Sequence, residues 1–285
     1  MKNKYQISVI ILTYNSEATI KKTVESALQI SDDVHIVDSY SSDSTINILS
    51  QYKFNVVQHE FENYSSQRNW AINNLQIKYE WQLHLDADER LSEELIKEIY
   101  NLENLVESNV DGYYIPRLVY FMGKPIRHGG MFPIWHLRLF KSGLGVCESR
   151  LYDQHFYVNG KTKKLKYWMI DDQRMSISEW VSRHNRWADA EAAELTLPSG
   201  KDVIQGKIFG NPVEKKRSVK KYYEKMPLFI RPFLFFIYRY FLKLGFLDGK
   251  EGLIFYVLQT FWFRFLVDVK IYELTNDIKE NEKDF

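Results

Sequence analysis

The stretch at residues 81–89 reads Trp81-Gln82-Leu83-His84-Leu85-Asp86-Ala87-Asp88-Glu89. Its pattern predicts a buried strand over residues 81–85, and a helix is predicted over residues 92–106. Side chains alternate along an extended backbone, so Asp86 and Asp88 are expected on the same side, just beyond the strand. Two such carboxylates suit Mg²⁺ or Mn²⁺, which would complete its shell with phosphate oxygens and water. A solvated turn is the alternative interpretation.

In the preceding residues, short apolar runs also alternate with helical patterns. Strands are predicted over residues 7–12, 34–37 and 54–57, and helices over residues 17–30, 44–51 and 65–75. This alternation is typical of a Rossmann-like α/β sheet, mostly parallel and covered by helices on both faces. Ligands of such sheets bind beyond the carboxyl ends of the strands, so the polar residues that follow each strand are the candidate site.

Polar residues follow the first two strands, and a polar helix comes after the third. Thr13, Tyr14 and Asn15 follow the first strand, and Asp38 with a Ser-rich turn follows the second. An aspartate there can accept a hydrogen bond from a nucleotide base, and free backbone N–H groups can meet an anion. In the third predicted helix, Gln67 and Arg68 can contact a nucleotide or diphosphate, although an ordinary surface role for Arg68 stays open.

The middle part of the chain, from about residue 112 to residue 172, is rich in aromatic residues. Strands are predicted over residues 113–120, 135–140, 155–158 and 165–169, and a helix over residues 178–197 that begins at Ser178 and ends at Pro198. Cys147 is the single cysteine, and nothing around it suggests a nucleophile, so a packing role is expected.

The last third differs in composition from the rest. Residues 228–247 and 253–269 are dense in Phe, Leu and Ile, but charged residues interrupt both runs, and a block of lysines and Arg217 precedes them. A spanning helix tolerates central charges poorly, so a helical hairpin in the membrane interface is the preferred interpretation. Packing on the catalytic domain or an oligomer interface is the alternative.

The predicted domains are therefore a catalytic domain over residues 1–200 and a C-terminal amphipathic, membrane-associating region over residues 201–285. Within the catalytic domain, residues 1–110 form the nucleotide-binding half and residues 111–200 the acceptor half. Lys and Arg number 38 against 37 Asp and Glu, which gives no reason to expect a nucleic-acid partner. The lone cysteine and an N-terminus without a signal-peptide pattern predict a peripheral protein on the cytoplasmic face of the inner (plasma) membrane.

Four motifs then identify a family. They are Thr-Tyr-Asn after the first strand, Asp38 with its Ser-rich turn, Gln-Arg-Asn-Trp-Ala from Gln67, and Leu-Asp-Ala-Asp-Glu from Leu85. In this order they resemble the nucleotide-binding half of family-2 glycosyltransferases with the GT-A fold, over residues 7–110. The resemblance implies that residues 13–15 line the nucleoside pocket and that Asp38 binds the base of a nucleotide-sugar, most often a UDP-sugar. It also implies that Asp86 contacts ribose or metal and that Asp88 binds Mn²⁺ or Mg²⁺.

The second half resembles a bacterial subgroup that elongates lipid-linked or lipopolysaccharide glycans. Its W-x-x-R-L-F motif matches at Trp135 and Arg138, which are expected to contact the acceptor or diphosphate, and an H-N-R helix follows. An ion pair that supports the strand is the alternative role for Arg138. The subgroup's catalytic base lies in a segment like D-E-H, whereas this chain has Gln at the middle position. Asp153 is therefore our candidate base, with Glu148 in reserve and His155 as a possible third metal ligand or diphosphate contact.

The predicted function is an inverting, metal-dependent transfer of a sugar from a nucleotide-sugar to an acceptor hydroxyl, in which one base removes the hydroxyl proton. Two alternatives stay open. The acceptor could be a polyprenyl phosphate, whose ionised oxygen needs no base. The protein could also be a catalytically silent nucleotide-sugar-binding scaffold at the membrane.

Overall fold

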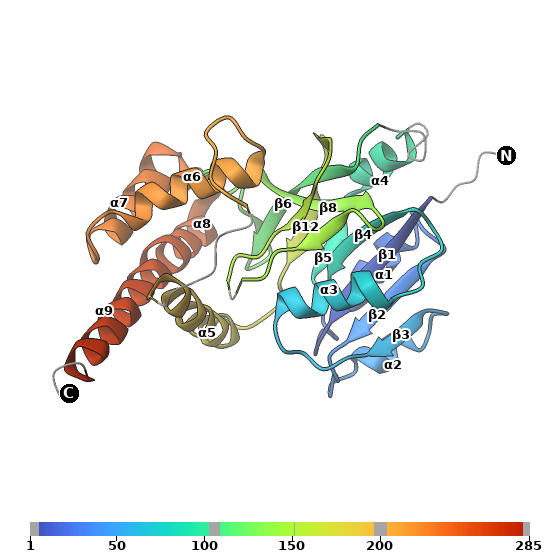
Figure 1. Ribbon diagram of the computed structural model, residues 1–285, viewed down its shortest axis with the longest axis horizontal. Coiled ribbons are helices and arrows are strands. Elements are labelled where there is room, and N and C mark those ends of the chain that lie inside the picture. Colours follow the sequence, from blue (N-terminus) through green and yellow to red (C-terminus); the bar gives the residue numbers. More distant parts are fainter. Residues whose placement is uncertain (1–5, 103–108, 151, 197–203, 282–285) are drawn as a thin grey trace. The chain divides into compact units, whose positions relative to one another are not determined.

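The computed structural model describes residues 6–102, 109–150, 152–196 and 204–281 (Figure 1). The chain divides into two compact units. The first unit comprises Met1–Gly123, Pro133–Ser149 and Gln154–Arg174, and the second comprises Lys124–Phe132, Arg150–Asp153 and Met175–Phe285. Each unit is held by its own core.

The first unit is built on a mixed sheet with the strand order β3-β2-β1-β4-β8-β6-β12-β5, and β11 pairs with β6. Its strands are β1 (Ile7–Thr13), β2 (Val34–Asp38), β3 (Asn55–Gln58), β4 (Trp81–Asp86), β5 (Glu89–Leu91), β6 (Gly112–Phe121), β8 (Ile134–Lys141), β11 (Thr162–Lys164) and β12 (Met169–Asp172). A small separate sheet pairs β9 (Gly145–Cys147) with β10 (Phe156–Val158).

The register of the parallel strands brings the candidate residues to one edge. Strand β1 pairs in parallel with both β2 and β4, which places Thr13 opposite Asp38 and Leu12 opposite Asp86. Strand β8 then runs antiparallel to β4 and β6. The carboxyl ends of β1, β2 and β4 therefore lie side by side (Figure 1).

Helices cover both faces of this sheet because alternate side chains of each strand point to opposite sides. Val9 and Ile11 of β1 belong to the core shared with α1 (Ile20–Ala27), α2 (Thr45–Leu49) and α4 (Glu93–Tyr100). Ile10 packs on the other face, in a cluster with Ala71 of α3 (Tyr64–Asn74). The predicted α/β sheet flanked by helices is thus confirmed.

Three local predictions need correction. The predicted helix over residues 92–106 ends at Tyr100, and residues 103–106 lie outside the described part of the chain. Residues 165–168 are not a strand, since β11 ends at Lys164 and β12 begins at Met169. Ser178 lies inside helix α5, and Ser176 is the cap, because its hydroxyl accepts the backbone N–H of Glu179 at 3.2 Å. The predicted end of this helix, at residues 198–200, is also outside the described residues.

The second unit is mainly helical. Its elements are the short strand β7 (Lys124–Pro125) and the helices α5 (Ile177–Thr196), α6 (Pro212–Glu224), α7 (Arg231–Ile237), η1 (Tyr238–Leu242), η2 (Gly245–Asp248), α8 (Gly249–Tyr256), η3 (Val257–Trp262) and α9 (Phe263–Asn281). Helices α5 and α9 lie side by side (Figure 1), and Ala188 of α5 packs with Phe263 and Val267 of α9. Both predicted apolar runs are therefore helical.

His184 occupies the centre of the α5–α9 contact. Its ring stacks on Trp180 with 3.4 Å between centroids and meets the edge of Phe263. Its Nδ1 lies 2.9 Å from the Trp180 carbonyl, and its Nε2 lies 3.0 Å from the side-chain amide oxygen of Gln259. Burial lowers the pKa of His184 from 6.5 to about 4, because a charged imidazolium would lose its hydration there.

This shift predicts that the protein loses stability in mild acid. The unfolded chain binds a proton at His184 near pH 6.5, whereas the folded chain resists protonation down to about pH 4. The contribution of the neutral ring is thus present above pH 6.5 and is lost as the pH falls through this window. We expect the loss to approach about 3 kcal/mol, measured as the free energy of urea unfolding.

The control is His184→Phe, which keeps an aromatic ring in place but cannot titrate. Its unfolding free energy should fall less between pH 7.5 and pH 4.5 than that of the unchanged protein. Equal pH dependence in the two proteins would contradict the assignment of this acid sensitivity to His184.

Candidate active site

The chain turns sharply where β4 ends. Strand β4 stops at Asp86, Ala87 and Asp88 form a turn, and β5 begins at Glu89. The extended backbone that was expected to place Asp86 and Asp88 on one side therefore does not continue through Asp88. Both aspartates are half-buried at the carboxyl edge of the sheet, and Glu89 is fully buried.

Asp86 is held between two arginines from different elements. Arg68 of α3 reaches both of its carboxylate oxygens at 3.1 Å, and Arg138 of β8 donates to Oδ2 at 2.8 Å. Arg138 also donates to Glu89 at 2.7 Å, and Glu89 in turn accepts the backbone N–H of Asp86 at 3.0 Å. The four side chains form one network with balanced formal charge.

The electrostatics of this network follow from burial and charge pairing. Burial alone would raise the pKa of Asp86, but the guanidinium groups of Arg138 and Arg68 lower it well below its usual range. Burial raises the pKa of Glu89 above its ordinary value, although Arg138 opposes this shift. Burial and the two arginines also lower the pKa of His84, so this ring adds no further positive charge behind the network.

The donor set around this turn bears on metal binding. Among residues 6–102, 109–150, 152–196 and 204–281, no group of three or more His, Cys, Asp or Glu side chains could hold a metal ion. Both oxygens of Asp86 already accept from guanidinium groups, so a cation bound directly to Asp86 would lie beside two positive charges that repel it. The half-buried Asp88 carboxylate fits a cation that takes its other ligands from phosphate and water.

Helix α3 ties the candidate residues together. The amide of Gln67 bonds to Ser39 at 3.1 Å and to the carbonyl of His59 at 3.2 Å. The Asn69 side chain makes two hydrogen bonds to the backbone of Cys147, at 2.8 and 2.9 Å. Asn63 caps the helix by accepting the backbone N–H of Ser66. The helix is therefore fixed at several points, which holds Arg68 in place.

The loops after β1 and β2 are joined by short polar contacts. The backbone N–H of Asn15 donates to the Ser41 hydroxyl at 2.9 Å, and the Asn15 side-chain oxygen accepts the backbone N–H of Ser42 at 2.8 Å. Asn15 has a φ of 44°, a left-handed conformation that asparagine tolerates better than most residues. Thr13 is buried within β1, whereas Tyr14 is 61% exposed and available to a ligand.

Asp38 is completely buried at the end of β2. Its carboxylate accepts the backbone N–H and the hydroxyl of Ser41 at 3.0 and 2.5 Å, and the amide of Gln58 at 3.3 Å. Because Asp38 is covered, a nucleotide base could bond to its carboxylate only after a shift of the groups around it. The Ser41 contacts thus connect base binding to the conformation of the loop.

Glu148 and His155 lie close together in the first unit. Glu148 is buried, and its Oε1 accepts the backbone N–H of His155 at 3.0 Å. Their backbones also pair, with the N–H of Glu148 donating to the carbonyl of His155 at 3.0 Å. Ser65 of α3 donates to the Glu148 carbonyl at 2.7 Å. Burial raises the pKa of the neighbouring Cys147 thiol, which favours the unreactive protonated form.

Asp153 belongs to the second unit, where it has a φ of 56°. Its carboxylate pairs with Lys216 of α6 at 2.7 Å, and its carbonyl accepts from Arg217 at 3.0 Å. Trp135 of β8 is half-buried in the first unit, with the Lys164 ammonium 4.7 Å from the ring centre. These are the local contacts of Asp153 and Trp135. Their roles as base and as acceptor or diphosphate contact stay predictions.

Sequence reasoning missed two residues that build the site. Glu89 stood inside a quoted motif but had no assigned role, and Phe156 was read only as strand. Phe156 lies against both arginines, with the guanidinium carbons of Arg68 and Arg138 5.2 and 6.0 Å from its ring centre. Glu89 follows Asp86 closely in the sequence. Two carboxylates next to a buried strand could have predicted a buried cation that pairs with both. Phe156 is positioned by the pairing of β10 with β9, and no local pattern in the sequence predicts that pairing.

Comparison with known proteins identifies relatives in Rickettsia. An uncharacterized glycosyltransferase of Rickettsia typhi is 28% identical over 218 residues, which cover 72% of this chain and 71% of the relative. Another from Rickettsia bellii is 38% identical over 94 residues, which cover 33% of this chain and 31% of that protein.

Solved structures with a similar arrangement include residues 1–349 of Staphylococcus aureus TarS in complex with UDP-GlcNAc. It is 15% identical and has a TM-score of 0.46, covering 94% of this chain and 92% of that one. Mannosyl-3-phosphoglycerate synthase from Rubrobacter xylanophilus is 13% identical with a TM-score of 0.44, covering 73% of this chain and 80% of that one. The sequence profile described as Glycosyl transferase family 2 matches residues 8–158, more than half of the chain. The chain therefore belongs to glycosyl transferase family 2.

Proposed function

We propose that this glycosyltransferase moves a sugar from a UDP-sugar to a hydroxyl group of a lipid-linked or lipopolysaccharide glycan, with inversion at the anomeric carbon. The observation that carries the proposal is the meeting of Arg68, Arg138 and Asp86 at the carboxyl edge of β4. Both guanidinium groups are paired with carboxylates, so they would offer a diphosphate hydrogen bonds rather than excess positive charge. The choice of uridine rests on the resemblance of the Thr-Tyr-Asn and Asp38 motifs.

Mn²⁺ or Mg²⁺ belongs to this proposal through Asp88. A divalent cation held by Asp88 and the donor diphosphate would offset the charge that develops on the leaving group. We propose Asp88 as the direct ligand ahead of Asp86, and the pairing of Asp86 with two arginines supports this choice. Asp86 then orients Arg68 and Arg138 or contacts ribose. His155, which is buried beside Glu148, is kept as a possible third ligand or diphosphate contact.

The acceptor hydroxyl must lose a proton as it attacks, and we propose Asp153 as the base. Its pairing with Lys216 keeps the carboxylate in one orientation. Glu148 remains the reserve candidate, because its buried carboxylate already accepts a hydrogen bond from the backbone N–H of His155. Trp135 and Arg138 are proposed to contact the acceptor or the diphosphate.

We also propose that the enzyme works on the cytoplasmic face of the inner membrane. The support is the apolar composition of the C-terminal helices, which includes one stretch, Gly245–Asn276, long and apolar enough to cross a membrane. The domain limits stay part of the proposal, with catalysis over residues 1–200 and membrane association over residues 201–285. A lipid-linked acceptor and a membrane-associated enzyme meet at the same surface.

The first test replaces the proposed metal ligand. Asp88→Asn should lower kcat/KM for UDP-sugar turnover by about a hundredfold or more, since the amide cannot hold the cation equally well. Nucleotide release is measured with UDP-, GDP- and dTDP-sugars, with and without Mn²⁺. The thermal unfolding temperature should stay near that of the unchanged protein.

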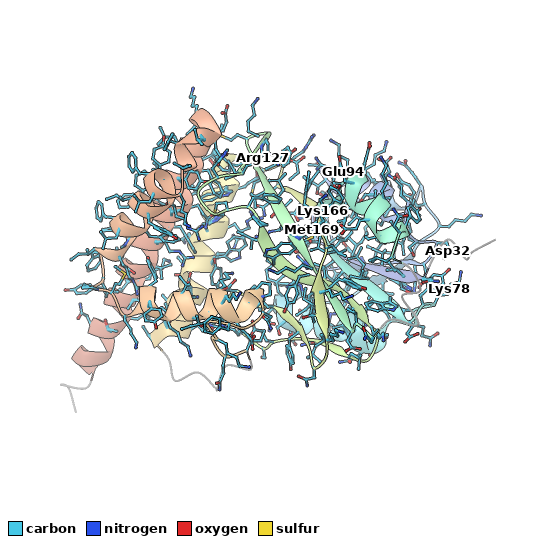
Figure 2. All side chains as sticks on the ribbon, turned by 90° about the horizontal axis from the view of Figure 1, so that it is seen from above. Asp32, Lys78, Glu94, Arg127, Lys166 and Met169 are labelled. Carbon is cyan, nitrogen blue, oxygen red and sulfur yellow. The ribbon has the colours of Figure 1, made fainter. Side chains whose placement is uncertain are left out.

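Asp32→Asn is the matched control, because Asp32 is an exposed carboxylate that pairs with Lys78 at 2.7 Å (Figure 2). Its kcat/KM should not change. Near-normal turnover in Asp88→Asn would remove the metal role of this residue. Binding of the donor by the unchanged protein without turnover on any acceptor would instead favour the silent scaffold.

The second test separates the candidate bases. Asp153→Asn should lower kcat by roughly 10²- to 10⁴-fold while the KM for the donor changes little, because the base acts on the acceptor. Glu148→Gln should retain more activity. The reverse pattern would move the role to Glu148, and full activity in both variants would favour a polyprenyl phosphate acceptor.

The third test concerns the ion network itself. Arg138→Met leaves the buried Glu89 without this cation, and such a change costs about 3–5 kcal/mol of unfolding free energy. Urea unfolding provides the measurement. Arg174→Met is the control, since Arg174 is 52% exposed at its side chain and pairs with Asp172 near the surface. Equal stability of the two variants would contradict a supporting role for Arg138.

A further inference from the structure

Four of the charged residues that interrupt the apolar C-terminal helices make polar contacts inside the second unit. Arg231 of α7 and Asp268 of α9 form an ion pair with side chains only 3% and 1% exposed. Arg264 of α9 pairs with Glu191 of α5 at 2.8 Å. Arg239 of η1 donates to a backbone carbonyl at 2.8 Å. Charges that argued against a spanning helix in the sequence therefore make contacts inside this unit, and the two ion pairs join helices.

Large apolar side chains are exposed where the chain turns between η1 and η2. We call the following five residues the apolar tip: Phe241 (52% exposed), Leu242 (71%), Leu244 (48%), Phe246 (44%) and Leu247 (54%). They fall within seven consecutive positions, so they form a continuous feature of the chain. Exposed apolar clusters of this kind mark interaction sites, because water contact disfavours them.

The exposed charges near the tip all have one sign. Between residues 241 and 250, the exposed charged side chains are Lys243 and Lys250. The one carboxylate in this range, Asp248, is partly covered and accepts hydrogen bonds from the backbone of residues 127 and 128. An apolar tip whose exposed charged neighbours in the chain are both lysines complements an anionic lipid surface.

We infer that the apolar tip enters a single leaflet of an anionic bilayer while Lys243 and Lys250 contact the lipid headgroups. This inference refines the membrane association proposed above by naming the part of the chain that inserts and the lipid charge it requires. It does not depend on which sugar or acceptor the enzyme uses.

A spanning orientation is disfavoured by the partners of the long apolar stretch. Gly245–Asn276 is long enough to span, but its C-terminal half packs along α5. Helix α5 carries exposed polar residues, among them Arg186 and Asp189, and Asp189 pairs with Lys270. Crossing the bilayer would bury these charges in hydrocarbon or strip α5 from α9, and both are costly.

A second copy of the chain is a less favourable binding partner for the apolar tip than an anionic bilayer is. Two tips placed face to face would bring the same exposed lysines together, and like charges repel. A bilayer with anionic headgroups instead supplies opposite charge beside the apolar layer.

The test uses the full chain and preformed vesicles of phosphatidylcholine alone or mixed with phosphatidylglycerol. The unchanged protein should float with the mixed vesicles and much less with phosphatidylcholine alone. Leu242→Asp with Leu247→Asp should lower the partition coefficient by roughly thirtyfold or more. Leu144→Asp is the matched control, since Leu144 is 42% exposed in the first unit, and it should float normally.

The outcomes separate the two proposals. If the tip variant floats normally, the proposed insertion of the apolar tip is wrong, but the proposed membrane association still holds. Failure of the unchanged protein to float on any vesicle would overturn both. A dimer in light scattering that Leu242→Asp abolishes would show that a second copy covers the tip, and would also overturn the inference. Donor hydrolysis in solution should be equal in all variants, which confirms that they are folded.

Insertion depth distinguishes one leaflet from a span. Leu242→Cys can be labelled selectively because the native Cys147 is buried. Brominated lipids should quench a fluorophore at position 242 most strongly when the bromine lies in the outer half of the near leaflet. Strongest quenching from the bilayer centre would overturn the single-leaflet orientation.

Discussion

The structure of the first unit depends on one carboxylate, Asp86, held between two guanidinium groups. Arg68 comes from α3 on one face of the sheet, and Arg138 comes from β8 within it, so this pair of contacts joins elements far apart in the sequence. A buried cation is costly unless it is paired, and Glu89 supplies the second counter-charge. The fold therefore brings opposite charges to the edge of the sheet before any ligand arrives.

This arrangement has consequences for donor binding. Side chains that are already fixed need little reorganisation when a charged group binds, which is how enzyme sites stabilise developing charge. Here α3 is fixed through its cap at Asn63 and through Asn69, which bonds to the backbone of Cys147. The loop contacts of Asn15 and Asp38 with Ser41 differ from this, because Asn15 is exposed and Ser41 only half-buried, so this side of the loop is open to a ligand.

The second unit uses charge pairing in another way. Its buried pair Arg231–Asp268 and the pair Arg264–Glu191 connect helices that would otherwise present ionised groups on an apolar surface. Pairing these groups inside the unit allows neighbouring aromatic and aliphatic side chains to remain outside. The charged residues of these helices thus stabilise helix packing, while some of their apolar residues form an exposed surface.

The sequence by itself determined the α/β class, the order of the first strands and helices, and the membership suggested by the motifs around Asp38, Arg68 and Asp86. These properties follow from local periodicity and from short motifs, which act within a few residues. Only the tertiary structure decided that Asp86 pairs with Arg138, that the chain turns at Asp88, and that the C-terminal charges are paired inside. Each of these depends on contacts between residues distant along the chain, for which periodicity carries no signal.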